Sequence, residues 1–278
     1  MNDVKIFFLS LFFSIKYSRN NKFSDLLLFR NAIEIDQISP FRNIFTGFKM
    51  PKFVRLTLPH FGNVRIDFDL SDNFQMAICE EFVKHKIYNL EPLNFIPDIS
   101  IDCGSYRGYF TFLINNRFSN CKKICIEPHP ENNRILNKTI EENDIRSIET
   151  FNKALSKSPD KVVLELWGSN MGLSNDQSGH LNLVEIETMS LFKLLAEIDV
   201  AKKLILKVDI EGSELDFFPD CIISLPKCCA VYLETHDGWN SLYSIQSRFE
   251  EYGFQFLIVR ERDLCIDSFA IRTGIDAQ

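Results

Sequence analysis

The sequence lacks the cysteine and histidine spacing of a zinc or redox centre. Its eight cysteines form no C-x-x-C pair, and neither His129 nor His180 stands in a metal-ligand pattern with them. Cys103, Cys125 and Cys265 lie instead in apolar, strand-like runs, where cysteine behaves as a small buried hydrophobe. We therefore expect reduced thiols in the core of a cytoplasmic protein, and no metal site.

Basic residues are outnumbered by acidic ones. The chain of 278 residues carries 31 lysines and arginines against 38 aspartates and glutamates, a formal net charge of −7. Because a protein that binds duplex nucleic acid usually shows a basic footprint, this balance argues against a nucleic-acid partner. The hydrophobic content of 45% allows one sizeable domain with a small N-terminal addition.

The most apolar run, residues 4–15, is too short to cross a bilayer, because a spanning helix needs roughly 20 apolar residues. No basic n-region or cleavage site marks it as a signal peptide. A helix docked on the domain is the favoured interpretation, within a helical extension over residues 1–50. Since Lys16, Arg19 and Lys22 follow at once, peripheral contact with a membrane surface through residues 4–15 stays open.

Residues 51–278 are predicted to form one α/β domain that begins with a β-hairpin. Val54, Leu56 and Leu58 alternate with polar residues, a turn-rich segment follows, and the alternation resumes over residues 64–68. This hairpin, together with a small polar loop at residues 168–174, is expected to shape the pocket for a substrate.

After the hairpin, strands and helices alternate, which implies a mostly parallel sheet covered by helices on both faces. Ser213 and Asp216 form a capping pattern for one of these helices. The expected strands are 99–102, 123–127, 148–152, 161–167, 204–209, 230–234, 254–259 and 268–272. The expected helices are 73–88, 108–118, 130–143, 189–197, 215–219 and 241–252.

The first predicted strand of this sheet runs into a glycine turn. Gly104 and Gly108 remove the Cβ where the backbone bends sharply or approaches a ligand, and a helix opening at Gly108 directs free N–H groups over the turn. The dinucleotide pattern G-x-G-x-x-G is absent. Asp102, two residues before the first glycine, favours an S-adenosylmethionine (SAM) site instead, because a carboxylate suits the cationic ammonium and sulfonium of SAM.

Glu127 ends the next apolar strand, at the spacing a nucleotide-type cofactor requires. In Rossmann-like units a carboxylate at this place hydrogen-bonds the ribose hydroxyls. The sequence therefore assigns the methionine part of SAM to Asp102, Gly104 and Gly108, and the ribose to Glu127. Two alternatives stay open. One is an NAD-dependent oxidoreductase, although the chain lacks the first glycine of the dinucleotide pattern and a Tyr-x-x-x-Lys pair. The other is a glycine turn with a purely structural role.

Two later strands end in charged side chains. Alternation along a strand puts Lys207, Asp209 and Glu211 on one face, and it puts Glu234 and His236 together in the same way. Such charges are unfavourable on an apolar central strand unless they are paired or face a cleft. His236 is therefore the first candidate for a general base, Asp209 the second, and Glu211 the group that orients them. A purely structural pair of Lys207 with Asp209 or Glu211 stays open.

In their order along the chain, these motifs resemble those of FkbM-type SAM-dependent methyltransferases. The resemblance covers roughly residues 54–271, and the motif that begins at Lys207 is its most specific element. The matching elements are Asp102-x-Gly104-x-x-x-Gly108-Tyr-Phe, Glu127-Pro-x-Pro, Asn152-x-Ala154-Leu-Ser, Asn170-x-Gly172, Lys207-x-Asp209-x-Glu211-Gly-x-Glu214 and Glu234-x-His236.

The resemblance implies a Rossmann-like class I methyltransferase fold, with a mostly parallel seven-stranded sheet. It also implies SAM-dependent O-methylation of a hydroxyl on a sugar, glycan or secondary metabolite. Further cofactor contacts follow from it: Ser105, Tyr109 and Asp209, with Asn152 and Ala154 at the adenine edge. A SAM-binding scaffold without turnover, acting in a glycan or polyketide assembly complex, is the alternative.

Overall fold

The computed structural model describes the greater part of the chain, in two compact units that divide after Lys86. The described residues are 53–57, 61–62, 64–69, 75, 82, 87–157, 160–167, 170–173, 183–236, 238–262 and 265–273. The predicted extension over residues 1–50, and most of the predicted helix at 73–88, lie outside them. Within the described residues, no helix combines the length and the apolar character needed to span a membrane.

The first unit contains the predicted β-hairpin. Strand β1 (Phe53–Thr57) pairs antiparallel with strand β2 (Arg65–Asp69), and Leu56 lies opposite Ile66 in the register. Ile66 is fully buried. The alternation of apolar and polar residues therefore predicts this pairing correctly.

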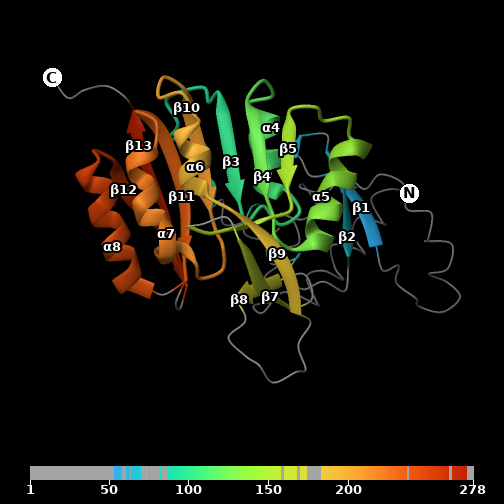
Figure 1. Cartoon of the computed structure of the whole chain (residues 1–278). Helices are drawn as coiled ribbons and strands as arrows, with labels where there is room; N and C mark the ends of the chain where they lie inside the picture. Colours follow the sequence, from blue (N-terminus) through green and yellow to red (C-terminus); the bar gives the residue numbers. More distant parts are fainter. Residues whose placement is uncertain are drawn as a thin grey trace, which may run out of the picture. The chain divides into compact units, whose positions relative to one another are not determined.

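The second unit is built on a seven-stranded sheet with the order β12-β13-β11-β10-β3-β4-β5 (Figure 1). Neighbouring strands are parallel except β13, which runs antiparallel to both β11 and β12. This arrangement confirms the predicted mostly parallel α/β sheet. The strands are β3 (Ile99–Cys103), β4 (Lys122–Ile126), β5 (Ile148–Phe151), β10 (Lys203–Val208), β11 (Cys228–Thr235), β12 (Gln255–Arg262) and β13 (Cys265–Thr273).

Helices cover both faces of this sheet. The helices are α4 (Tyr109–Arg117), α5 (Pro130–Glu142), α6 (Leu191–Ala196), α7 (Glu214–Cys221) and α8 (Gly238–Glu251). Ile101 of β3 belongs to a hydrophobic cluster with side chains of α6, α7 and α8. The next residue, Asp102, accepts a hydrogen bond from Thr111 of α4. Since successive strand residues point to opposite faces, α4 lies on the face away from α6, α7 and α8.

Local sequence explains where these helices begin. The His129 side chain accepts hydrogen bonds from the first backbone N–H groups of α5, and Pro130 supplies a first-turn residue without an N–H. Ser190 caps α6 by accepting from the Lys193 N–H. Helix α4 starts instead from Gly108, whose φ of 86° lies in the left-handed region that favours glycine.

A separate four-stranded sheet, with the order β6-β9-β7-β8, interrupts the sequence between β5 and β10. Figure 1 shows it on the side of the main sheet where β3 and β4 end. Its strands are β6 (Ala154–Leu155), β7 (Lys161–Trp167), β8 (Asn170–Leu173) and β9 (Leu183–Met189).

This small sheet corrects two sequence predictions. Residues 170–173 form a strand paired antiparallel to β7, where a polar loop was predicted. Met189 ends a strand, whereas the prediction placed it at the start of a helix; α6 begins at Leu191. The reason is the alternation in β9, which buries Ile186 and Thr188 while Glu187 between them faces solvent.

Candidate active site

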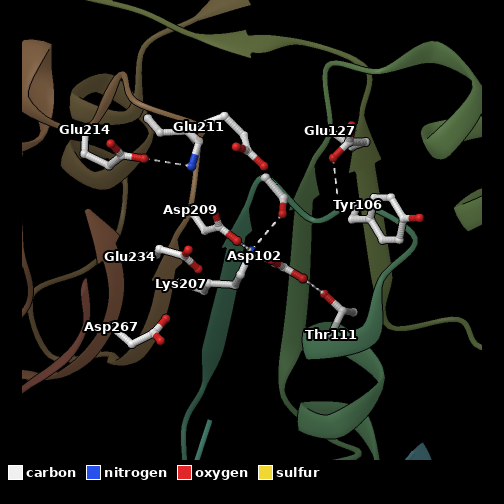
Figure 2. A network of polar contacts seen from close by, with 12 residues as sticks. Asp102, Tyr106, Thr111, Glu127, Lys207, Asp209, Glu211, Glu214, Glu234 and Asp267 are labelled. Atoms are coloured by element: carbon white, nitrogen blue, oxygen red, sulfur yellow. Dashed lines mark hydrogen bonds and ion pairs between the residues drawn. The ribbon is translucent and has the colours of Figure 1, made fainter. Parts of the chain in front are cut away.

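The carboxyl ends of β3, β4, β10 and β11 meet at one edge of the main sheet, and Figure 2 shows the polar side chains gathered there. In the strand register Asp102 lies beside both Lys207 and Cys125, and Lys207 lies beside Tyr232. Ligands of open α/β sheets bind outside such carboxyl ends. The strand-end residues that the sequence predicted for the site therefore lie at the edge of the sheet where a ligand is expected.

The glycine turn after β3 is held between two neighbouring strands. The N–H groups of Gly104 and Ser105 both donate to the carbonyl of Ile126, at 2.9 and 3.1 Å. Gly104 has φ +73°, and a Cβ added there would lie 1.7 Å from the carbonyl oxygen of Asp209. A Cβ at Gly108 would meet a side-chain atom of α5 at 2.5 Å. Gly104 is thus required by close packing as well as by its backbone conformation, whereas Gly108 is required by its φ of +86°.

Asp102 presents a buried carboxylate at the tip of β3. Its Oδ2 accepts a hydrogen bond of 2.8 Å from the Thr111 hydroxyl, whereas its Oδ1 makes no hydrogen bond and lies 3.5 Å from Lys207 Nζ. Burial raises the pKa of Asp102, and Lys207 and Thr111 oppose that shift. The buried Oδ1 is therefore an acceptor that a ligand's N–H group can satisfy.

Lys207 links the glycine turn to the end of β10. Its Nζ donates to the Gly104 carbonyl at 2.7 Å and lies 3.3 Å from Asp209 Oδ2. Burial lowers the pKa of Lys207, but the carboxylates of Asp209 and Asp102 outweigh burial and raise it above its usual range. Lys207 therefore stays charged, and the Lys207–Asp209 pair left open by the sequence is present.

Glu127 is buried beyond the end of β4 and holds the surrounding backbone. Its Oε2 accepts the Tyr106 N–H at 2.6 Å, and its Oε1 accepts the His129 N–H at 2.9 Å. Burial raises the pKa of Glu127 to about 8, against the lowering effect of these two hydrogen bonds. The amide of Asn152 donates to the carbonyls of Glu127 and Pro128, at 2.8 and 2.9 Å.

The remaining predicted cofactor residues fall into two groups. Ser105 and Tyr109 are buried beside the glycine turn, at 4% and 1% exposure. Asn152 is exposed next to Glu127, and Ala154 is buried in β6. The structure thus gathers Ser105 and Tyr109 with the turn, and Asn152 with the end of β4.

His236 lies within a group of carboxylates at the ends of β10 and β11. Its Nε2 is 3.6 Å from Glu211 Oε2, 3.7 Å from Glu234 Oε1 and 4.0 Å from Asp209 Oδ1. Its Nδ1 is 3.0 Å from Glu214 Oε1. The structure therefore brings together His236, Asp209 and Glu211, the three residues predicted to be catalytic.

The crowding of carboxylates shifts the pKa values of this cluster. Burial lowers the pKa of His236, but the hydrogen bond to Glu214 and the nearby carboxylates outweigh it and raise the pKa to about 9. Burial, followed by the charge of Asp209, raises the pKa of Glu211 to about 7 and that of Glu234 to about 9. In the free protein the imidazole therefore holds its proton at neutral pH.

Glu214 lies in the site, although the sequence interpretation gave it no role. Besides contacting His236, it accepts hydrogen bonds from the backbone N–H groups of Ile210 (3.1 Å) and Gly212 (3.2 Å). These N–H groups flank Glu211, whose φ of 57° lies in the left-handed region. The predicted Ser213 cap is wrong, because the Ser213 side chain makes no capping hydrogen bond to α7. The signal that could have pointed to Glu214 was its place in the motif that begins at Lys207, three residues after Glu211.

Two arginines of β12 also reach this group, and no sequence motif pointed to them. Arg262 donates to Glu234 Oε1 at 2.7 Å, and Arg260 donates to Asp267 Oδ2 at 2.7 Å. Arg262 also lies 3.5 Å from Asp267. These arginines partly balance the acidic side chains on the β11 and β13 side of the site.

Among solved structures, the chain is similar to methyltransferase FkbM from Methylobacillus flagellatus KT, with 15% identity and a TM-score of 0.48 over 66% of this chain and 45% of that chain. It thus spans less than half the length of that protein. TYW2 of M. jannaschii, in complex with AdoMet, is 10% identical with a TM-score of 0.45 over 81% of this chain and 89% of that one. Trm1 from Pyrococcus horikoshii, in complex with S-adenosyl-L-methionine, is 13% identical. The TM-score is 0.43, and the match covers 73% of this chain and 56% of that one.

No protein among those with curated descriptions matches the sequence at a significant level. The family of the methyltransferase FkbM domain matches residues 102–256, which is more than half of the chain and includes the glycine turn, Glu127, Asp209 and His236. The sheet order and this match agree on a Rossmann-like class I methyltransferase fold. The chain belongs to the FkbM methyltransferase family.

Proposed function

We propose that the protein transfers a methyl group from SAM to a hydroxyl of a sugar, glycan or secondary metabolite. One observation carries the proposal: the glycine turn of a nucleotide-type site and the cluster around His236 lie at the same sheet edge, joined through Lys207 and Asp209. Family membership supports methyl transfer. When bound, SAM supplies a methyl group that its sulfonium has already activated for displacement.

The residues at the ends of β3 and β4 fit SAM. Asp102 offers a buried carboxylate oxygen without a hydrogen bond, which suits a cationic ammonium. Gly104 lets the turn pack directly against the Asp209 carbonyl, which keeps the turn beside the end of β10. Glu127 retains acceptor capacity for ribose hydroxyls, since each carboxylate oxygen carries two lone pairs and here accepts one N–H group.

The cluster around His236 would receive the proton of the acceptor hydroxyl. In the proposed reaction the acceptor oxygen would take the methyl group from SAM, S-adenosylhomocysteine would leave, and a side chain of the protein would take the hydroxyl proton. Because His236 already holds a proton at neutral pH, Asp209 is the better base there, and His236 and Glu211 orient it. Above about pH 9, His236 itself becomes available.

We also place this reaction in the cytoplasm. All seven cysteines in the described part of the chain are unpaired. Free thiols of this kind persist in a reducing compartment.

Transfer of a labelled methyl group tests the proposal. The purified protein is incubated with SAM carrying a radiolabelled methyl group and with fractionated metabolites and glycans, and products are identified by mass spectrometry. We expect a hydroxylated compound to gain the label and the mass of one methyl group, and the Asp209→Asn variant to lose this activity. Binding of SAM with no labelled product would instead support a scaffold, and label on a nitrogen or carbon atom would refute O-methylation.

A further inference from the structure

The acceptor side of the site contains three donor atoms that converge without bonding one another. Asp209 Oδ1, Glu211 Oε2 and His236 Nε2 all lie within 4.8 Å of each other. The Nε2 atom is 3.6 Å from the Glu211 oxygen and 4.0 Å from the Asp209 oxygen, and both distances exceed hydrogen-bond length. Neither carboxylate therefore uses the imidazole nitrogen as a hydrogen-bond partner.

These spacings are close to those of ligands around one metal ion. Donor atoms bound at about 2.1 Å lie about 3.0–3.4 Å apart at octahedral or tetrahedral angles, and about 4.2 Å apart when trans. Small side-chain rotations would bring the three atoms onto one centre. Figure 2 shows Asp209 and Glu211 approaching the same space from the chain segment that follows β10.

A second feature supports the same conclusion: His236 and Asp209 are each held through their other polar atom, and the backbone on both sides of Glu211 is anchored. Glu214, 2% exposed, contacts the His236 Nδ1 at 3.0 Å, which directs the opposite nitrogen, Nε2, toward the carboxylates. Metal-binding histidines almost always donate their second N–H to such a carboxylate. Glu214 also holds the N–H groups on both sides of Glu211, and Lys207 holds the other oxygen of Asp209.

We propose that Asp209, Glu211 and His236 bind one divalent cation of the Mn²⁺ type. Binding of the ion displaces the proton that His236 holds in the free protein. Two carboxylates and a neutral imidazole then supply a net charge of −2 to a divalent ion, and hard oxygen donors combined with one imidazole suit Mn²⁺ better than a soft metal. Glu234 lies nearby, but Arg262 already occupies its Oε1. The sequence alone predicted no metal site, because only the fold brings residues 209, 211 and 236 together.

The role of the cation rests on the proposed function. An acceptor hydroxyl that coordinated the ion would become more acidic, so its proton could leave to solvent water as the methyl group arrives, and Asp209 would then serve as a ligand of the ion rather than as the base. The cation thus acts as a Lewis acid on the acceptor. It plays no part in holding Asp102, Gly104 or Glu127.

Direct binding tests the site without any methyl transfer. The full chain, stripped with a chelator and free of SAM, is titrated with MnCl₂, and the loss of the free Mn²⁺ signal is followed by electron paramagnetic resonance. We expect one bound ion per chain. We expect His236→Ala and Glu211→Gln to weaken binding at least tenfold, and Glu214→Gln to weaken it about 10–100-fold as an outer-shell change.

The variants are chosen so that a negative result is informative. Glu211 has a half-exposed side chain, so its change to glutamine should not unfold the chain. Glu149→Gln, an exposed acid on β5, is the matched control and should bind Mn²⁺ like the wild type. No bound Mn²⁺, or equal binding by wild type and the Glu211 variant, would overturn the proposal.

Two further results separate this inference from its alternatives. Preferential Zn²⁺ binding that disappears in Cys265→Ser would move the site to Glu234, His236 and Cys265, and so refute the ligand set proposed here. Mn²⁺ binding without methyl transfer would retain the metal site while refuting the proposed function. Methyl transfer that a chelator leaves unchanged would refute the metal's role and retain the function.

Discussion

The two sides of this site are built in different ways. On the proposed cofactor side, at the ends of β3 and β4, Asp102 and Glu127 are only 1% and 4% exposed, and Glu127 is held by two backbone N–H groups. On the acceptor side, at the ends of β10 and β11, Asp209 and Glu211 are 24% and 36% exposed, and the contacts are between charged side chains.

This difference suggests different roles for shape and charge. The cofactor side is fixed by close packing, such as that of Gly104 against the Asp209 carbonyl. The acceptor side is governed by electrostatics, and three of its groups have pKa values of about 7 to 9. We therefore expect substitutions on the first side to act on SAM binding and folding, and substitutions on the second to act on turnover and its pH dependence.

The largest effect is expected from Gly104→Ala. The new Cβ would lie 1.7 Å from a backbone oxygen at a positive φ, so the turn and the end of β10 must shift. We expect SAM binding to become undetectable by calorimetry and the melting temperature to fall. Gly253→Ala is the matched control, because φ there is +77° with no atom within 4 Å of the new Cβ; it should lose stability but keep SAM binding. Equal behaviour of the two variants would contradict a role for close packing.

A large effect on turnover is expected from His236→Ala. Removal of a group that transfers or orients the proton should lower turnover by about 10²–10⁴-fold and leave SAM affinity nearly unchanged. Asp209→Asn should act similarly, and the double variant should lose little more, because the two residues work as a unit. Steady-state kinetics with SAM calorimetry measures both quantities.

The pH profile of turnover then distinguishes the two bases. If Asp209 is the base, wild-type turnover is already high at neutral pH. If His236 is the base, turnover rises as pH passes through about 9, where the imidazole loses its proton. Native turnover in His236→Ala would show that the histidine takes no part.

Glu127→Ala should reduce SAM binding at least a hundredfold. Above about pH 8, where Glu127 is ionised, two hydrogen bonds from ribose hydroxyls to this carboxylate contribute about 1.5–3 kcal/mol each, and about 1.4 kcal/mol corresponds to a tenfold change in affinity. The variant also leaves the N–H groups of Tyr106 and His129 without their partner, so circular dichroism must show that it remains folded. Wild-type affinity in a folded variant would remove Glu127 from the ribose site.

The raised pKa of Glu127 predicts a pH dependence of stability. The folded protein keeps this proton up to about pH 8, whereas the unfolded chain releases it near the ordinary value of 4.5. Between these values the unfolded state binds fewer protons, so rising pH favours unfolding. Urea denaturation should therefore show wild-type stability falling between about pH 5 and 8 relative to Glu127→Gln. A constant difference between the two proteins would contradict the raised pKa.

The smallest effect is expected from Asn152→Ala. The Asn152 amide donates to two backbone carbonyls beside Glu127, so its loss should loosen this loop and weaken SAM binding by about tenfold or less. A much larger loss, measured by calorimetry, would mean that Asn152 contacts the adenine directly.

Local sequence predicted the positions of the residues at the ends of β3 and β4. Gly104, Gly108 and Glu127 follow apolar strands directly, so their positions depend on one strand and the turn after it. Asp209 and His236 were predicted in the same way, from strand ends. Glu211 was placed by strand alternation, yet β10 ends at Val208 and the chain reaches Glu211 through a turn with positive φ.

Long-range pairing explains what the sequence did not predict. Arg262 meets Glu234 only through the register of β12 on β13, which shifts between Ile258 and Arg260. Strand β8 depends on pairing with β7 across a short connection, and its four residues carry no strand pattern of their own. Glu214 was visible in the motif, but its role depends on the approach of His236 from another strand.

The most direct test of the account compares SAM binding by Glu127→Ala and His236→Ala in one calorimetric series with the wild type. We predict that wild type binds SAM at one site, that Glu127→Ala loses at least a hundredfold in affinity, and that His236→Ala binds like the wild type. No heat with SAM or its demethylated product in the wild type would contradict the cofactor assignment. Equal losses in both variants would contradict the division of the site into a cofactor side and an acceptor side.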